Sequence, residues 1–287
     1  MRIRIDDTVL YFDVEGAGLR AEGPCMVEQP TVILLHGGPG FDHSMFKPAY
    51  GALADVAQVI YLDMRGQGRS DPSDRGTWLL DRWVDDVAAF CKALEIRKPI
   101  VLGASFGGFV AYGLATRHPD LLGGMVILSS APHIEVDPVV AKFAELSGPS
   151  VGEAARRFFD TPFADGAFEG FIMHCMPLYG LADADPDVLA RVMMNPEMVS
   201  TFFLPGGEWR SFDYRAGAAA FASPSLIIHG EHDPIVPIAF ASDAAAAMHP
   251  ATTRFAILPG LRHDIMRDEG AKVLELIRAF IAEAAAE

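Results

Sequence analysis

One serine in this chain has the neighbours that nucleophilic catalysis requires: it lies in Gly103-Ala104-Ser105-Phe106-Gly107, with a glycine on either side. The apolar run at 99–102 before it reads as a buried strand, and residues 109–118 after it have a helical pattern. Small residues allow a tight turn from strand to helix, and such a turn exposes the serine hydroxyl. The pattern predicts that Ser105 attacks an acyl carbon if a histidine stands beside it.

A serine hydroxyl needs a general base, and the base needs an acid that orients it. We predict that His263 is the base, because it lies between a strand-like run at 253–258 and the final helix. We predict that Asp233 is the acid, because it follows another strand-like run at 226–228. The order serine, aspartate, histidine differs from the orders found in the chymotrypsin and subtilisin groups.

A metal site is the alternative for the loop that carries Asp233, because His229 and His232 precede it there. Their spacing matches no zinc signature, and a catalytic role explains Asp233 better. We therefore expect no metal. Acyl transfer through a serine to water needs no cofactor, so none is expected either.

Glycines follow the apolar run at 31–35, in His36-Gly37-Gly38-Pro39-Gly40. Without a Cβ, glycine lets the backbone turn its N–H groups toward a site. We expect the Gly38 amide, with Gly37 as the near alternative, to form an oxyanion hole with the amide of Phe106. His36 is expected to fix the shape of this loop.

The elements that must position these residues alternate along the chain. Residues 3–5 and 8–14 look like an antiparallel pair of strands. Continuous apolar runs, typical of strands covered on both faces, and amphipathic helical patterns then take turns, which predicts an α/β fold with a mostly parallel sheet flanked by helices. The apolar runs are at 31–35, 56–62, 99–102, 125–128, 226–228 and 253–258, and the helical patterns at 80–94, 238–248 and 271–285.

The alternation stops between residues 133 and 215, a segment rich in aromatic residues and methionine. The segment is too long for an ordinary loop, so we predict a helical cap inserted into the core domain. The predicted core then comprises residues 1–132 and 216–287, and the cap residues 133–215. Most apolar cap residues are expected to pack on the core, and a few to line a pocket.

Composition excludes several classes of partner. The chain has 287 residues, 51% of them apolar, and a formal net charge of −15. This charge argues against nucleic acid and against anionic membrane surfaces. We expect a cytoplasmic protein with a small-molecule or short-peptide substrate, because no signal-peptide or membrane-spanning pattern is found and the three cysteines have no metal-ligand spacing.

With these motifs assembled, the chain resembles the α/β-hydrolase family over essentially its whole length. The resemblance is carried by the H-G-G-P-G loop, the serine turn, the helical cap, the two late loops, and Asp63-Met64-Arg65-Gly66-Gln67-Gly68-Arg69-Ser70. In that family the last of these motifs is mostly architectural. A serine at the turn, in place of aspartate, argues against the dehalogenase and epoxide-hydrolase branches.

Within the family, H-G-G-P-G resembles prolyl iminopeptidases of the S33 type, which release an N-terminal proline. In them acidic cap residues bind the substrate's free amine, and tryptophan commonly follows the serine, where this chain has Phe106. The resemblance implies Glu197 and Glu208 as candidate substrate-binding residues, together with Gly37 and Trp209.

Three functions remain open at this point. The first is a prolyl iminopeptidase-like aminopeptidase, favoured by the H-G-G-P-G loop. The second is an esterase, lactonase or carbon–carbon hydrolase for a small apolar acyl substrate, favoured by the aromatic and methionine-rich cap. The third is a non-catalytic ligand receptor on the same fold, which the complete set of Ser105, Asp233 and His263 disfavours.

Overall fold

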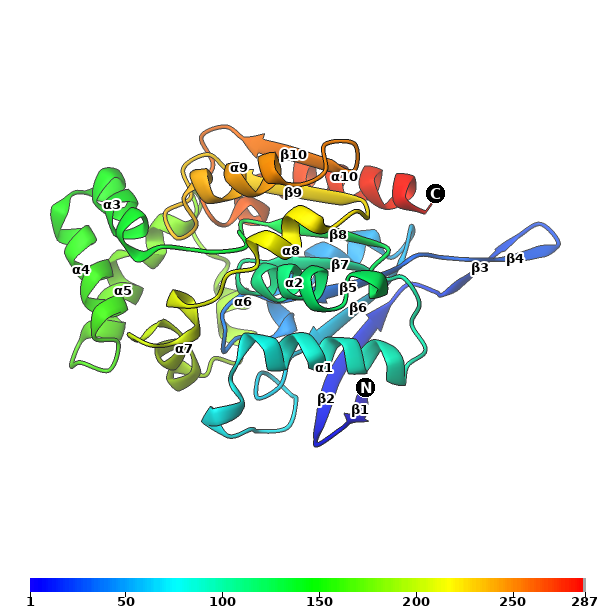
Figure 1. Ribbon diagram of the computed structural model, residues 1–287, viewed down its shortest axis with the longest axis horizontal. Helices are drawn as coiled ribbons and strands as arrows, with labels where there is room; N and C mark the ends of the chain where they lie inside the picture. The colour runs from blue at the N-terminus through cyan, green and yellow to red at the C-terminus, as the bar shows by residue number, and fades with distance from the viewer. Residues whose placement is uncertain (286–287) are drawn as a thin grey trace.

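The computed structural model describes residues 1–285, which form an eight-stranded sheet with helices on both faces and a helical insertion beyond one end (Figure 1). The spatial order of the strands is β1-β2-β6-β5-β7-β8-β9-β10. β1 and β2 pair antiparallel with their neighbours, and all other pairs are parallel. The predicted α/β class and mostly parallel sheet are confirmed. The strands are β1 (Arg2–Ile5), β2 (Thr8–Glu15), β5 (Thr31–Leu35), β6 (Gln58–Asp63), β7 (Ile100–Ala104), β8 (Gly124–Leu128), β9 (Ser225–Gly230) and β10 (Thr253–Leu258).

Both faces of the central strands are buried because successive side chains point to opposite sides. On β5, Val32 and Leu34 join the cluster beneath α10 (Ile265–Ala284). Ile33 and Leu35 join the cluster beneath α1 (Leu80–Ala93) and α2 (Phe106–Arg117). This two-sided burial explains why the strands read as continuous apolar runs in the sequence.

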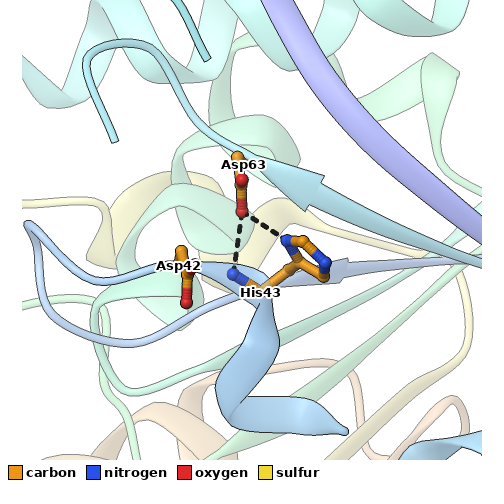
Figure 2. A group of neighbouring side chains, drawn as sticks. All are labelled: Asp42, His43 and Asp63. Carbon is orange, nitrogen blue, oxygen red and sulfur yellow. Dashed lines mark hydrogen bonds and ion pairs between the residues drawn. The ribbon is translucent and has the colours of Figure 1, made fainter. Parts of the chain in front are cut away.

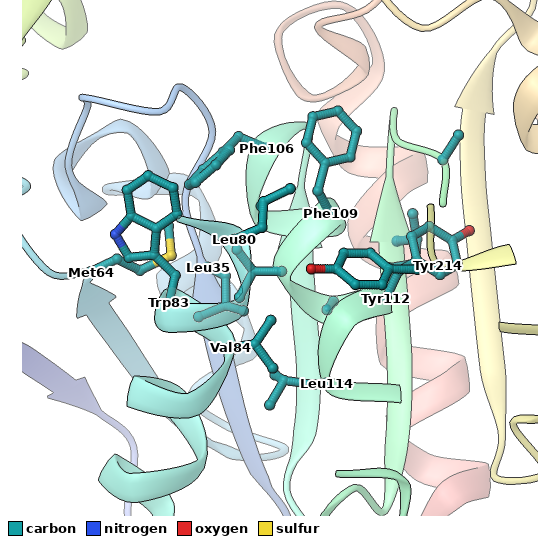
Figure 3. Close-up of a cluster of buried hydrophobic side chains, with 14 of the residues drawn as sticks. Leu35, Met64, Leu80, Trp83, Val84, Phe106, Phe109, Tyr112, Leu114 and Tyr214 are labelled. Carbon is teal, nitrogen blue, oxygen red and sulfur yellow. The ribbon is translucent and has the colours of Figure 1, made fainter. Parts of the chain in front are cut away.

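The cluster between α1 and α2 supports the turn that carries Ser105 (Figure 3). Phe106, the residue after the serine, is fully buried. Its ring meets Trp83 of α1 edge-on at a centroid distance of 5.0 Å and Phe202 of the insertion at 5.3 Å. The start of α2 is therefore anchored by aromatic packing on two sides.

The segment between β8 and β9 is helical, as predicted, and its helices α3, α4 and α5 lie beyond the left end of the sheet in Figure 1. Its aromatic residues pack mainly on one another: the rings of Phe159 and Trp209 are parallel at 5.8 Å, and Phe203 meets Trp209 at 4.7 Å. The helices from β8 onward are α3 (Val136–Ser147), α4 (Pro149–Asp160), α5 (Ala167–His174), α6 (Pro186–Arg191), α7 (Pro196–Phe203), α8 (Arg215–Ala220) and α9 (Ile238–Ala247).

Two features differ from the sequence-based expectation. A hairpin of β3 (Leu19–Glu22) and β4 (Cys25–Glu28) projects from the body of the protein (Figure 1). All eight of its strand residues are exposed, and each strand has four residues, too few for a clear strand pattern in the sequence. The final helix begins at Ile265, six residues before the predicted start, with non-helical backbone angles at Glu269 that interrupt the pattern.

No helix within residues 1–285 combines the length and the apolar character needed to cross a membrane. All three cysteines are free thiols. Burial raises the pKa of Cys91 and of Cys175 to about 12, so both stay protonated at neutral pH. Cys25 lies on the exposed hairpin.

Candidate active site

Ser105 occupies a strained turn between β7 and α2. Its φ of +52° and ψ of −116° lie in a region that non-glycine residues rarely adopt. A Cβ at Gly103 would overlap the carbonyl of Gly107, and one at Gly107 would overlap the carbonyl of Leu35. Glycine is required at both positions because strand, turn and helix approach so closely. The serine itself is half-buried.

Asp233 and His263 lie on the loops after β9 and β10, and they are hydrogen-bonded. His263 Nδ1 is 2.7 Å from Asp233 Oδ2, with the carboxylate fully buried. The other carboxylate oxygen accepts the backbone N–H groups of Ile235 at 2.9 Å and Val236 at 2.8 Å. An ionised carboxylate accepts Nδ1–H, so this bond leaves His263 Nε2 as the basic nitrogen.

A chain of hydrogen bonds joins the serine turn to the histidine loop through the end of β8. The Ser105 amide donates to the Leu128 carbonyl at 2.9 Å, and the hydroxyl of the next residue, Ser129, donates to the His263 carbonyl at 2.6 Å. Because β7, β8, β9 and β10 are neighbouring parallel strands, their carboxyl ends share one edge of the sheet. The structure thus brings Ser105, Asp233 and His263 to the same edge.

The glycine loop after β5 lies beside the serine. A Cβ at Gly37 would stand 3.6 Å from Ser105 Cβ, and Gly38 has a φ of +125°, which favours glycine. The Phe106 amide belongs to the first residue of α2 and has no acceptor within the helix. Gly37 and Phe106 therefore flank the serine, and the use of the Gly38 and Phe106 amides as oxyanion donors stays a prediction.

The other candidate substrate-binding residues have partners of their own. Glu208 Oε2 accepts the Leu80 amide at 2.8 Å and so caps the start of α1. Glu197 is exposed and forms an ion pair with Arg75 at 3.0 Å. Trp209 is 1% exposed within the aromatic cluster. The role of these three residues in substrate binding stays a prediction.

One further group of side chains has the composition of a metal site: Asp42, His43 and Asp63 (Figure 2). Its oxygens already accept hydrogen bonds from the protein. Asp63 Oδ1 accepts the His43 amide at 2.8 Å and lies 2.7 Å from His43 Nδ1, while Asp63 Oδ2 accepts the Arg69 amide at 2.8 Å. Asp42 accepts both the Ser44 hydroxyl and the Arg69 guanidinium. These donors give the group a structural role in holding the loop after β6.

Two residues that contact His263 have no signal in the sequence. Ser129 precedes His263 by 134 positions, and Tyr179 belongs to the insertion. The Tyr179 ring meets the His263 ring edge-on at a centroid distance of 5.0 Å, and its carbonyl accepts the Asp264 amide at 2.7 Å. Only the folded chain brings these residues to the histidine.

The fold and this edge of the sheet define a class of protein: a hydrolase with a mostly parallel sheet, a serine at a strand-to-helix turn, and a histidine–aspartate pair on later loops. The family model of the alpha/beta hydrolase fold matches residues 30–268. The chain belongs to the alpha/beta hydrolase family, and it is a hydrolase.

Relatives within this family differ in the reactions their names describe. The chain is 28% identical to a 2-hydroxymuconate semialdehyde hydrolase of Pseudomonas sp. (strain CF600), over 88% of this chain and 87% of the other. It is 27% identical to a proline iminopeptidase of Levilactobacillus brevis, over 84% of each chain. The crystal structure of the proline iminopeptidase of Mycobacterium smegmatis has a TM-score of 0.81 at 21% identity, covering 100% of this chain and 99% of the other.

Proposed function

We propose that the protein hydrolyses its substrate by acyl transfer to Ser105. His263 acts first as general base for the serine hydroxyl and then as general acid for the leaving group. Asp233 holds the imidazole in the required tautomer, and the Gly38 and Phe106 amides stabilise the oxyanion. Water then attacks the acyl-enzyme. The observation that carries the proposal is the 2.7 Å bond between His263 and a buried carboxylate at the edge of the sheet where the strained serine turn lies.

Covalent labelling tests this mechanism without knowledge of the substrate. A fluorophosphonate reacts with an activated serine: the new O–P bond forms as fluoride leaves, and the serine proton goes to the base. We expect one adduct per chain, mapped to Ser105 by peptide mass spectrometry, and none in Ser105→Ala. Equal labelling of the Ser105→Ala variant would contradict the proposal.

The first candidate reaction is removal of an N-terminal proline. It is supported by the H-G-G-P-G loop beside the serine and by the proline iminopeptidases among the relatives. In this proposal the cap, residues 133–215, sets the substrate, and Gly37, Glu197, Glu208 and Trp209 contribute to its binding.

The second candidate is hydrolysis of a neutral acyl compound, either an ester, a lactone or a carbon–carbon bond. The supporting observation is that both candidate amine-binding carboxylates are engaged, Glu208 by the start of α1 and Glu197 by Arg75. A cationic substrate amine would have to compete with these partners. The relative named as a 2-hydroxymuconate semialdehyde hydrolase is in keeping with this second candidate.

Parallel assays separate the two candidates. A proline arylamide and short p-nitrophenyl esters are offered to the wild-type protein, with Ser105→Ala as the control for contaminating activity. Cleavage of the arylamide supports the aminopeptidase. Strong ester turnover without arylamide cleavage supports the neutral acyl substrate and excludes the aminopeptidase.

A further inference from the structure

A short segment of the insertion, residues 179–182, lies against the loop that carries His263. The Tyr179 carbonyl accepts the Asp264 amide at 2.7 Å, and the Arg262 guanidinium donates to the Gly180 carbonyl at 3.4 Å. Both neighbours of His263 in the chain are therefore bonded to this segment. The Tyr179 ring also packs edge-on against the His263 ring.

The same segment is held by one carboxylate on the first turn of α10. Both oxygens of Asp268 accept the Leu181 amide, at 3.0 and 2.9 Å, and one also accepts the Ala182 amide at 2.9 Å. Helix capping does not explain this carboxylate, because Asp264 already accepts the Arg267 amide at the start of α10. The bonds of Asp268 to Leu181 and Ala182 join parts of the chain that are 86 and 87 positions apart.

The core domain also holds His263. Asp233 binds its Nδ1, and the Ser129 hydroxyl binds its carbonyl. Residues 179–182 of the insertion therefore add a second set of contacts to the loop that carries His263. A general base must stand within hydrogen-bond reach of the proton that it takes, and a misplacement of about 1 Å can cost about 100-fold in rate.

We propose that Asp268 is a positioning residue for His263. Its carboxylate binds the amides of Leu181 and Ala182 and so holds Tyr179 against the loop of His263. The position of this segment of the insertion therefore affects the orientation of the base. The inference rests on the proposed role of His263. Asp268 itself does not touch the reacting atoms.

Three variants test the link. Asp268→Ala removes both acceptor oxygens of the side chain, and Asp268→Asn keeps one of them. Glu275→Ala removes a charge from the same helix at an exposed site, where Glu275 pairs with Lys272. We expect kcat to fall by roughly 10- to 100-fold in Asp268→Ala with KM nearly unchanged, because the base acts in the transition state. Asp268→Asn should retain more of the wild-type kcat, and Glu275→Ala all of it.

Hydrogen exchange supplies a readout that does not depend on activity. In Asp268→Ala the amides of Leu181, Ala182 and Asp264 should exchange faster than in wild type, and Glu275→Ala should leave them protected. Amide exchange is also compared with and without Asp268→Ala in a protein that carries Ser105→Ala. This comparison measures the contact of Asp268 with Leu181 and Ala182 when the nucleophile is absent. If Asp268→Ala does not fold, Asp268→Asn carries both measurements.

The outcomes are distinguishable. Faster exchange together with an unchanged kcat would overturn the positioning role, and unchanged exchange would overturn the link itself. If Glu275→Ala lowered stability and kcat as much as Asp268→Ala does, that result would also overturn the positioning role. Full activity of Ser105→Ala would instead refute the proposed function, while the exchange result would stand.

Discussion

Among the described residues, two buried histidine–aspartate pairs at the carboxyl ends of this sheet are hydrogen-bonded through Nδ1, and their bond lengths are the same. His263 Nδ1 is 2.7 Å from Asp233 Oδ2, and His43 Nδ1 is 2.7 Å from Asp63 Oδ1. Both carboxylates are fully buried. Distance and burial therefore do not distinguish the pair proposed for catalysis from a pair that holds a loop.

The other bonds of the two carboxylates do distinguish them. Each oxygen of Asp63 accepts a backbone amide, one from His43 and one from Arg69. Asp233 Oδ1 accepts both backbone N–H groups. Oδ2 lies near a ring nitrogen of His263 and one of His229, the latter at 3.4 Å. In the described part of the chain, backbone amides therefore bind both oxygens of Asp63 but bind Asp233 through Oδ1.

The neighbours of the two histidines, His43 and His263, also differ. The His43 ring stacks on Tyr11 at 5.5 Å and fits against Tyr61. The His263 loop is instead bonded to Ser129, next to the turn of the serine. The enclosure of His43 by aromatic rings is in keeping with a structural role for its pair, and the catalytic role of the His263–Asp233 pair stays a proposal.

Removing the nucleophile is the largest expected change. Ser105→Ala should lower kcat by roughly 10⁶-fold with the unfolding transition preserved, because the remaining groups have no oxygen to activate. The matched control is Ser70→Ala, which deletes a hydroxyl bonded to the Asp63 carbonyl at 2.6 Å. Ser70→Ala should lower the melting temperature and leave kcat of the folded protein near wild type. Equal kcat losses in both variants would break the comparison.

Asp233→Asn should affect activity far more than stability. The amide oxygen can keep the bonds to Ile235 and Val236, and the amide NH₂ then faces His263, which can accept it by changing tautomer. The wrong tautomer should lower kcat by about 10⁴-fold, as measured by steady-state kinetics. A variant that retains wild-type kcat would remove Asp233 from the mechanism.

Asp63→Asn should show the reverse behaviour. Whichever oxygen becomes NH₂, it meets a backbone N–H of His43 or Arg69, and a backbone amide has no tautomer to change. The unsatisfied donors should lower the free energy of unfolding by about 1–3 kcal/mol, measured by denaturant titration. Activity of the folded fraction should stay within a few-fold of wild type. Loss of activity without loss of stability would contradict the structural assignment.

A pH titration probes a feature that the two regions share. Each carboxylate has a second buried histidine nearby, His36 beside Asp63 and His229 beside Asp233, and burial lowers the pKa of both. In the unfolded chain these groups titrate near their ordinary pKa of about 6.5, so below that pH the unfolded state binds more protons. The free energy of unfolding should therefore fall as pH decreases from about 7, by at most about 1.4 kcal/mol per pH unit for each histidine.

Denaturant titrations at several pH values measure this slope. His229→Gln should reduce it, because glutamine does not titrate while its amide can still donate to the Val236 carbonyl that His229 binds at 2.7 Å. A slope that does not change in the variant would show that His229 titrates alike in both states.

The strands and the site loops could be predicted because their residues carry local signals. Apolar runs mark strands that are buried on both faces, and Ser105, Asp233 and His263 each follow such a run. The hairpin of β3 and β4 could not be predicted, since its pairing rests on backbone hydrogen bonds between exposed residues. The first turn of α10 lies outside the predicted helix because the backbone at Glu269 interrupts the helical pattern.

The residue types that could do chemistry, and the order in which they occur, can be read from the sequence alone. Parallel strands end at one edge, so residues that follow those strands must lie near one another. The hydrogen-bond partners of the carboxylates follow from the tertiary structure alone. It assigned Glu208 to the start of α1, Asp63 to two backbone amides and Asp268 to a segment of the insertion. The physical reason is that most of these partners lie 20 to 128 positions apart, so their approach depends on how helices and loops pack, which no local pattern of residues records.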